Sequence, residues 1–255
     1  MPSCAIPRSH GFRSRSASRP DSGTERNGTE LTSAAKDPGA PDAGGLELSA
    51  LGDVRVLGRL GEGGRSIVYD AIWQGRPVAL KVYKATAVVR HARKHPVPLA
   101  EFEHDRNGRF FRAPGLAPYV AEPLAWMSTP GVSATVQERL EGQLYYFRFQ
   151  ARDGRVEEEL FGHVARIVEL AHAASLYDVD LHAMNVMVVE GPDGQPWPKL
   201  FDFNLIPFHV RPPNPVVAFL LKAGLRSVRE RDLRKLRRFH DFGRVERKLL
   251  HFYRD

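Results

Sequence analysis

The chain changes character once, at Glu141 and Gly142, and this change limits its possible folds more than any other feature. Five short β-prone runs precede it, separated by turns that contain glycine or proline: residues 54–60, 67–73, 78–83, 120–127 and 133–140. A helix-compatible segment, residues 99–112, follows the third run, and Pro96 and Pro98 argue against a helix before it. The first half therefore predicts five strands with one inserted helix.

The second half is predicted to be mainly helical. Residues 157–174 carry apolar side chains at the helical period of about 3.6 residues: Leu160, Phe161, Val164, Ile167, Val168 and Ala171. A short hairpin is expected from residues 186–189 and 199–201, around the turn at 191–194. Helices are expected at 215–223 and 227–254, with Ser227 and Glu230 as a capping box, whereas residues 145–149 fit strand or helix equally. The fold class is α+β.

Composition sets the domain boundaries. Residues 1–50 are rich in Ser, Gly, Pro, Arg and Asp, and they predict a disordered polar tail before a folded domain at 51–255. That domain divides into a sheet-rich part, 51–140, and a helical part, 141–255. Cys4 is the only cysteine, so an intramolecular disulfide is excluded. No apolar run approaches the ~20 residues of a membrane span and no signal core is visible, which favours the cytoplasm.

Positive charge is concentrated near the end of the chain. Residues 222–248 contain eleven Lys or Arg against four acids, an excess equal to the net charge of +7 of the whole chain. Such a segment is typical of contact with anionic membrane headgroups or a phosphorylated glycolipid, while nucleic acid is not expected as a partner. The alternative is the solvated face of a surface helix.

Two motifs in the first half suit the binding of phosphate groups. Glycines let backbone N–H groups approach phosphate oxygens without a side-chain clash, and the turn after the first run reads Gly61-Glu62-Gly63-Gly64-Arg65-Ser66-Ile67-Val68. Lys81 ends Val78-Ala79-Leu80-Lys81 in the third run. Taken singly, a glycine turn is more often structural, and a strand lysine usually faces solvent. The helix expected at 99–112 carries three acids spaced two residues apart, Glu101, Glu103 and Asp105, so they point to different faces, and Glu103 lies near its centre.

The second half carries oxygen ligands at a spacing that suits metal and hydroxyl chemistry. Asp180-Leu181-His182-Ala183-Met184-Asn185 lies between the long helix and the hairpin, and Asp202-Phe203-Asn204 follows the hairpin. A carboxylate can accept the proton of a hydroxyl, and carboxylate and amide oxygens are the ligands that Mg²⁺ prefers. Each aspartate could instead cap a helix or shape a turn.

Taken in order, these motifs resemble the protein-kinase superfamily over residues 53–255. The resemblance implies a bilobal fold that binds ATP with Mg²⁺ or Mn²⁺. It assigns Asp180 as the base, Asn185 and Asp202 as metal ligands, and Lys81 with Glu103 as the phosphate anchor. The rest of the implied nucleotide site comprises the lid, strand residues and a hinge at 138–140: Gly61, Gly63, Ser66, Val68, Ala79, Glu138 and Leu140.

Departures from the protein-kinase pattern indicate another kind of acceptor. Asp178-Val179 replaces the His-Arg before the catalytic aspartate, and Asn204 replaces the glycine of Asp-Phe-Gly. His182 stands where a lysine is usual, and it either screens the γ-phosphate or only orders the loop. Together with Arg231-Asp232-Leu233-Arg234-Lys235-Leu236, this looks like bacterial lipopolysaccharide-core kinases that act on Kdo or heptose, and like kinase-like proteins of the PhoP regulatory network.

The expected activity is therefore transfer of the ATP γ-phosphate to a hydroxyl on a sugar or glycolipid of the bacterial envelope. The expected location is the cytoplasm, peripheral at the inner membrane through residues 222–248. A minimal protein Ser/Thr kinase is one alternative. A pseudokinase that binds nucleotide or a partner is the other.

Overall fold

The computed structural model describes residues 47–151 and 157–240, all within one compact unit. Residues 1–46 of the predicted tail and residues 241–254 of the last predicted helix lie outside the described residues. The predicted boundary at residue 51 is too late. Leu48 and Leu51 are buried in the core of the first sheet, so the folded part already includes Leu48.

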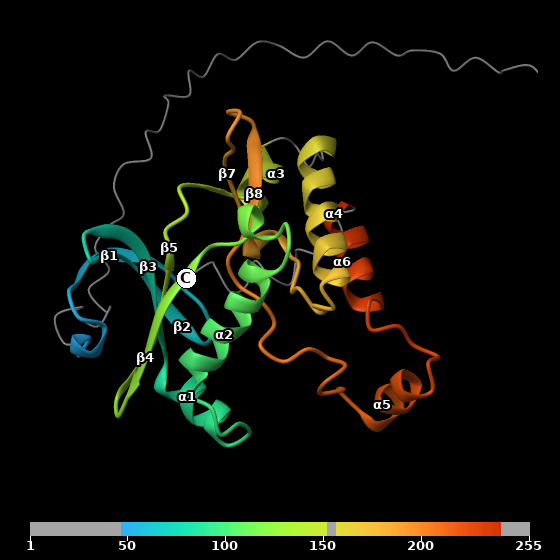
Figure 1. Cartoon of the computed structure of the whole chain (residues 1–255), viewed down its shortest axis with the longest axis horizontal. Helices are drawn as coiled ribbons and strands as arrows, with labels where there is room; N and C mark the ends of the chain where they lie inside the picture. Colours follow the sequence, from blue (N-terminus) through green and yellow to red (C-terminus); the bar gives the residue numbers. More distant parts are fainter. Residues whose placement is uncertain (1–46, 152–156, 241–255) are drawn as a thin grey trace, which may run out of the picture. The chain divides into compact units, whose positions relative to one another are not determined.

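A five-stranded antiparallel sheet forms the first part of the fold, in the order β1-β2-β3-β5-β4 (Figure 1). Its strands are β1 (Val54–Glu62), β2 (Ser66–Trp73), β3 (Arg76–Tyr83), β4 (Pro123–Thr129) and β5 (Val132–Glu138). All five predicted strands are present, with ends shifted by zero to three residues. One face buries an apolar core that includes Tyr69, Val78, Leu80 and Val136.

Two helices, not one, follow β3. Helix α2 (Leu99–Arg112) has the predicted bounds and packs against β4 and β5 (Figure 1). Helix α1 (Ala85–Ala92) was not predicted. The two prolines exclude a helix only next to themselves, and α1 ends four residues before Pro96.

The second part combines a three-stranded antiparallel sheet with four helices. Strands β7 (Val186–Glu190) and β8 (Pro196–Leu200) form the predicted hairpin, and β6 (Gly142–Leu144) adds an unpredicted strand beside β7. The helices are α3 (Tyr145–Ala151), α4 (Glu158–Ala173), α5 (Pro215–Lys222) and α6 (Glu230–His240). Residues 145–149, which fitted strand or helix, are therefore helical.

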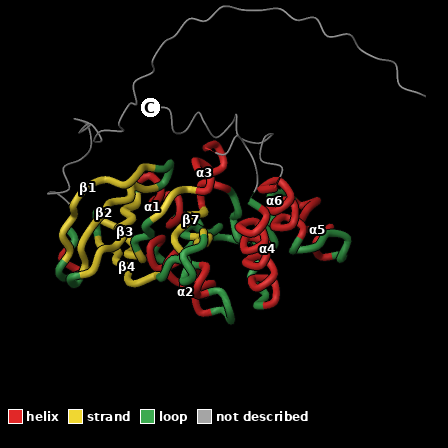
Figure 2. Tube along the Cα trace, turned by 90° about the horizontal axis from the view of Figure 1, so that it is seen from above, coloured by secondary structure: helices red, strands yellow, loops and turns green. Residues whose placement is uncertain are grey.

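Helix α4 supplies the central apolar face of the second core. Five of its six periodic apolar residues are buried, and Phe161 packs against the same cluster while partly exposed. Helix α6 lies beside α4, as both views show (Figure 2), and buries Phe239 in that cluster. The backbone N–H of Ala121 donates to the carbonyl of Leu200 at 2.8 Å, which ties the segment before β4 to the end of β8.

The predicted capping box before α6 is not formed. The hydroxyl of Ser227 accepts from the backbone N–H of Arg229 at 3.2 Å, and the carboxylate of Glu230 pairs with Arg226 and Arg234. The arginines on either side attract this carboxylate away from the backbone of Ser227.

No helix within residues 47–151 and 157–240 combines the length and apolarity needed to cross a membrane.

Candidate active site

Lys81 lies at the centre of a buried ionic cluster. It is 8 % exposed in β3, and its ammonium lies 2.6 Å from Glu103 Oε1 and 3.3 Å from Asp202 Oδ1. Three segments distant in sequence, namely β3, α2 and the residues after β8, therefore meet at this ammonium. Of the three acids considered on α2, Glu103 is the partner, since it is 1 % exposed and the register of the helix carries it beneath the sheet.

The cluster contains more negative than positive charge. Burial alone would lower the pKa of Lys81, but Asp202 and Glu103 outweigh burial and raise that pKa, so the ammonium stays charged. Burial, reinforced by Asp202, raises the pKa of Glu103 against the opposing effect of Lys81. Two carboxylates thus share one ammonium, an arrangement that favours a further cation nearby.

The glycine-rich turn joins β1 to β2 next to this cluster. The backbone N–H of Gly63 donates to the carbonyl of Ser66 at 2.8 Å, and Ser66 is buried. Val68 is paired with Gly61 on one side and with Lys81 on the other, so the strand register carries the turn to the strand of Lys81. A Cβ atom added to Gly61 would meet no atom within 4 Å, and its φ is not in the left-handed region. Packing within the chain therefore does not require this glycine.

Asp180, the first residue of the Asp180–Asn185 motif, has a left-handed backbone conformation. Its φ is +60°, and that of Asp178 is +63°. The side-chain amide of Asn185 donates to the backbone carbonyl of Asp180 at 3.0 Å, and Lys235 of α6 forms an ion pair with its carboxylate. Burial would raise the pKa of Asp180, but Lys235 outweighs burial and holds that pKa below its ordinary value. Asp180 is therefore ionised at neutral pH.

The donor set of Asn185 and Asp202 fits a hard divalent cation. Asp202 Oδ1 is buried and accepts no hydrogen bond within the described residues, although Lys81 lies near it. Asn185 uses its amide nitrogen on Asp180, which leaves its amide oxygen as an acceptor. The N–H of Phe201 lies 3.4 Å from the carbonyl of Asn185, so the two motifs are neighbours. Within the described residues, no group of three or more His, Cys, Asp or Glu could hold a metal ion.

Two buried aspartates hold this loop, and neither was expected to belong to the site. Asp178 is fully buried and accepts from the side-chain amide of Asn204, the backbone N–H of Phe208 and the guanidinium of Arg231, at 2.7, 3.0 and 2.8 Å. Asp232 of α6, also fully buried, accepts from the backbone N–H groups of Asp178 and Val179 at 2.7 and 2.9 Å. Helix α6 thus holds the loop in place through Asp232 and Arg231.

A sequence signal for Asp232 was available. It shares one face of α6 with Leu236 and Phe239, at helical spacings of four and seven residues. An acid on the apolar stripe of a basic helix implies a buried polar partner. The partner is His172 of α4, whose Nε2 lies 3.0 Å from Asp232 Oδ2, in addition to the loop backbone.

Arg106 is a second residue that the sequence reading missed. From α2 it donates to the backbone carbonyl of Asn204 at 3.0 Å and to that of Tyr177 at 2.7 Å. Burial lowers its pKa to about 10, so it remains charged at neutral pH. Phe203 stacks on Phe110 of the same helix, with ring centroids 4.1 Å apart. One helix therefore holds Lys81, through Glu103, and both motif loops.

His182 is not suited to supply positive charge in this arrangement. Burial lowers its pKa more than the charge of Asp180 raises it, so the imidazole is neutral at neutral pH. Positive charge beside the expected base comes instead from Lys235, which forms an ion pair with Asp180. The Nδ1 atom of His182 is buried and makes no hydrogen bond within the described residues, so neither of the two expected roles has a side-chain contact to support it.

Glu138, the first residue of the expected hinge, is already hydrogen-bonded within the protein. The backbone N–H of Glu138 donates to the carbonyl of Glu122 at 2.8 Å, and its carboxylate bonds to Lys199 at 2.6 Å. The N–H of Glu138 is therefore used in this hydrogen bond and is not free to donate to an adenine ring. Leu140 lies outside β5 and β6, and Ala79 is buried in β3, so these two remain consistent with a nucleotide site.

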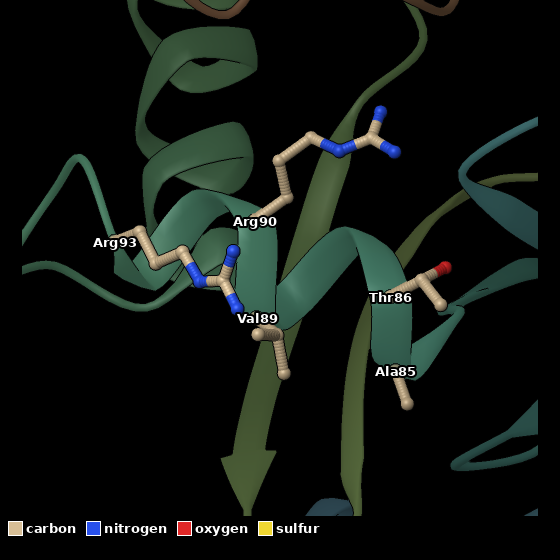
Figure 3. Close-up of a pocket in the computed structure, with 5 residues that line it drawn as sticks. All are labelled: Ala85, Thr86, Val89, Arg90 and Arg93. Atoms are coloured by element: carbon tan, nitrogen blue, oxygen red, sulfur yellow. The ribbon is translucent and has the colours of Figure 1, made fainter.

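A cavity of about 390 Å³ on α1 lies apart from these residues. Its lining comes from α1 and the residue that follows it: Ala85, Thr86, Val89, Arg90 and Arg93 (Figure 3). None of the candidate residues lines it, so it is not the site described here.

Neither a scan against models of known protein families nor a search of curated proteins found a match to this chain. Inference about function therefore depends on the residues and their geometry.

Proposed function

We propose that this chain has a kinase-like fold and transfers the γ-phosphate of ATP, with Mg²⁺ or Mn²⁺, to a hydroxyl group. The observation that carries the proposal is the sharing of the Lys81 ammonium between Glu103 and Asp202, at 2.6 and 3.3 Å. A lysine anchored in this way on a central strand is typical of kinases, in which it positions the α- and β-phosphates.

The arrangement of the first sheet supports this fold. The strand order β1-β2-β3-β5-β4, with a helix after β3 that supplies the partner of the β3 lysine, is the arrangement that the resemblance implies. The glycine turn between β1 and β2 covers the phosphates in that arrangement, and Gly61, Gly63 and Ser66 form the lid.

Asp180 accepts the proton of the acceptor hydroxyl as its oxygen attacks the γ-phosphorus. A new bond forms between the acceptor oxygen and phosphorus, while the bond from phosphorus to the bridging oxygen breaks and ADP leaves. Lys235 holds the ionised carboxylate in place and supplies the positive charge that His182, neutral at this position, does not.

Asn185 and Asp202 would hold the metal ion through oxygens that the described residues leave available. The ion, when bound, neutralises charge on the phosphate oxygens. Helix α6 keeps the base in position, because Asp232 binds the backbone of Asp178 and Val179 two residues or fewer before Asp180.

The acceptor class follows from the sequence resemblance. Asp178, His182 and Asn204 depart from the pattern of protein kinases, and the motif from Asp180 to Asn185, with His182 as its third residue, resembles that of sugar and glycolipid kinases. The proposed acceptor is a sugar or glycolipid of the bacterial envelope, and the proposed location is the cytoplasmic side of the inner membrane.

Transfer of labelled phosphate from ATP into a cell-envelope extract tests this proposal. Wild type should label a glycolipid fraction in the presence of Mg²⁺, and Asp180→Asn should lose at least about 99 % of the rate. Binding of Mg-ATP, measured as a rise in melting temperature, should persist in Asp180→Asn and disappear in Lys81→Met. A wild-type protein that Mg-ATP does not stabilise would refute the proposal.

A further inference from the structure

A second cavity lies beside the proposed base and differs in character from the cavity on α1. It has a volume of about 430 Å³ and lies between the segment after Asp202, the start of α5, and α6. Six of its ten lining residues are cationic and none is acidic. The cations are Arg211, Arg226, Arg231, Arg234, Lys235 and Arg238.

The cavity is connected to Asp180 by one of its own lining residues. Lys235 lines the cavity and also pairs with the carboxylate of Asp180. Arg231 lines it as well and pairs with Asp178, in the loop that carries Asp180. A molecule in this cavity would therefore share the cation that pairs with the proposed base.

Positive charge in the cavity exceeds what the protein itself neutralises. Arg226 and Arg234 share the single carboxylate of Glu230. Arg211 and Arg238 are exposed and form no ion pair with any acid in the described part of the chain. Convergent guanidinium groups of this kind suit a phosphate, which accepts several charge-assisted hydrogen bonds at once.

The rest of the lining is apolar. Phe208 and Val217 are buried, and Ile206 and Pro213 complete the surface. The guanidinium groups of Arg226 and Arg231 lie 5.7 and 5.9 Å from the centre of the Phe208 ring, which holds them over this surface. An apolar floor under basic walls fits the face of a sugar ring that bears a phosphate.

We infer that this cavity is the acceptor site and that it selects acceptors that already carry a phosphate group. The inference depends on the proposed function for the word acceptor, since the cavity itself indicates only an anionic ligand next to Asp180. Arg211 and Arg238 are the residues that bind the phosphate of the acceptor, because their charges are not committed elsewhere in the described chain.

Direct binding of glucose 1-phosphate to the full-length protein, measured by calorimetry without ATP, tests the cavity. Each charge-assisted contact is worth on the order of tenfold in affinity. Arg211→Gln/Arg238→Gln should therefore bind at least about tenfold more weakly than wild type. Glucose, which lacks the phosphate, should not compete.

The matched control is Arg229→Gln/Arg237→Gln. It removes the same charge from exposed residues on or next to α6 that do not line the cavity. This control should bind glucose 1-phosphate as wild type does. An equal loss in both double variants would overturn the inference, because diffuse charge on the helix would then explain binding.

Two further measurements separate the possible failures. If phosphatidylcholine vesicles that contain phosphatidylglycerol bind the protein and glucose 1-phosphate does not, the basic surface contacts membrane and the acceptor cavity is refuted. If glucose 1-phosphate binds and Mg-ATP fails to raise the melting temperature, the cavity is upheld as an anion site and the phosphotransfer proposal fails.

Discussion

The side-chain amide of Asn204 donates a hydrogen bond of 2.7 Å to the carboxylate of Asp178. These two residues are the departures from protein kinases that flank the proposed base and the proposed metal ligand. The structure joins them by this hydrogen bond, so both departures belong to a single interaction. The paired side chains join the loop before Asp180 to the segment after Asp202.

This pairing predicts a measurable coupling. Asn204→Ala should lower the free energy of unfolding by about 1–3 kcal/mol, because it leaves a buried carboxylate oxygen without its partner. A double-mutant cycle with Asp178→Ala should give a coupling of about 0.5–3 kcal/mol in urea denaturation. The exposed pair Arg166 and Glu169 on α4 is the control and should couple by less than about 0.5 kcal/mol. A coupling of zero for the buried pair would contradict the prediction.

Lys81→Met should be strongly destabilising. It leaves Glu103 and Asp202 without their shared ammonium, and loss of one partner from a buried ion pair costs about 3–5 kcal/mol. The pKa of Glu103 is already raised, and removal of Lys81 raises it further, so a proton can bind Glu103 in the folded variant at a pH where the unfolded chain is ionised. The deficit should therefore shrink as the pH falls.

Urea denaturation at two pH values measures this effect. Lys84→Met is the matched control, since Lys84 pairs with Glu62 at the surface and its side chain is 33 % exposed. It should lose less than about 1 kcal/mol. A deficit in Lys81→Met that is equal at acidic and neutral pH would contradict the electrostatic explanation.

Lys235→Met should move the acidic limb of the pH–rate profile to higher pH. Lys235 holds the pKa of Asp180 below its ordinary value, and burial alone would raise that pKa. In the variant, Asp180 becomes protonated at a higher pH, and the protonated form cannot accept the hydroxyl proton. The measurement is kcat/KM for phosphate transfer across pH 4–8, with Arg237→Gln of the same helix as the control. A limb that stays in place would show that Lys235 does not control Asp180.

Gly61 and Gly131 should respond to alanine in opposite ways. Gly61→Ala should change the free energy of unfolding by less than about 1 kcal/mol, since its Cβ meets no atom and its φ is ordinary, yet it should weaken Mg-ATP binding about tenfold. Gly131 in the β4–β5 turn has a φ of +114°, so Gly131→Ala should cost more than about 1 kcal/mol and leave Mg-ATP affinity unchanged. An unchanged affinity in Gly61→Ala would argue against a phosphate lid.

Local patterns were sufficient to predict most of the elements. The strands of the first sheet, α2 and α4 each have a strong period or clear turn residues at their ends, and all are present. Helix α1 was missed because the effect of Pro96 and Pro98 was extended over the whole segment after β3, although α1 ends four residues before Pro96. The three-residue strand β6 is too short to show an alternation, and it depends on pairing with β7.

The candidate site could be predicted only where motifs name its residues. The pairing of Lys81 with an acid of α2 was implied by the resemblance, and the spacing of the acids showed only that they point to different faces, so the choice of Glu103 needed the structure. Arg106 and Lys235 act through partners 55 to 98 residues away, and such pairings leave no local signal, whereas Asp232 is marked by its place on the apolar stripe of α6. The roles of Asp178 and Asn204 were hidden because each was compared with a family pattern separately, while their hydrogen bond exists only in the folded chain.

The position of Arg106 has a consequence for movement of helix α2. Helix α2 carries Glu103 and Arg106 on its buried side, so an outward swing of this helix would break the ion pair with Lys81 and both hydrogen bonds to the loops in a single motion. Displacement of α2 is therefore costly, because all three contacts are lost together.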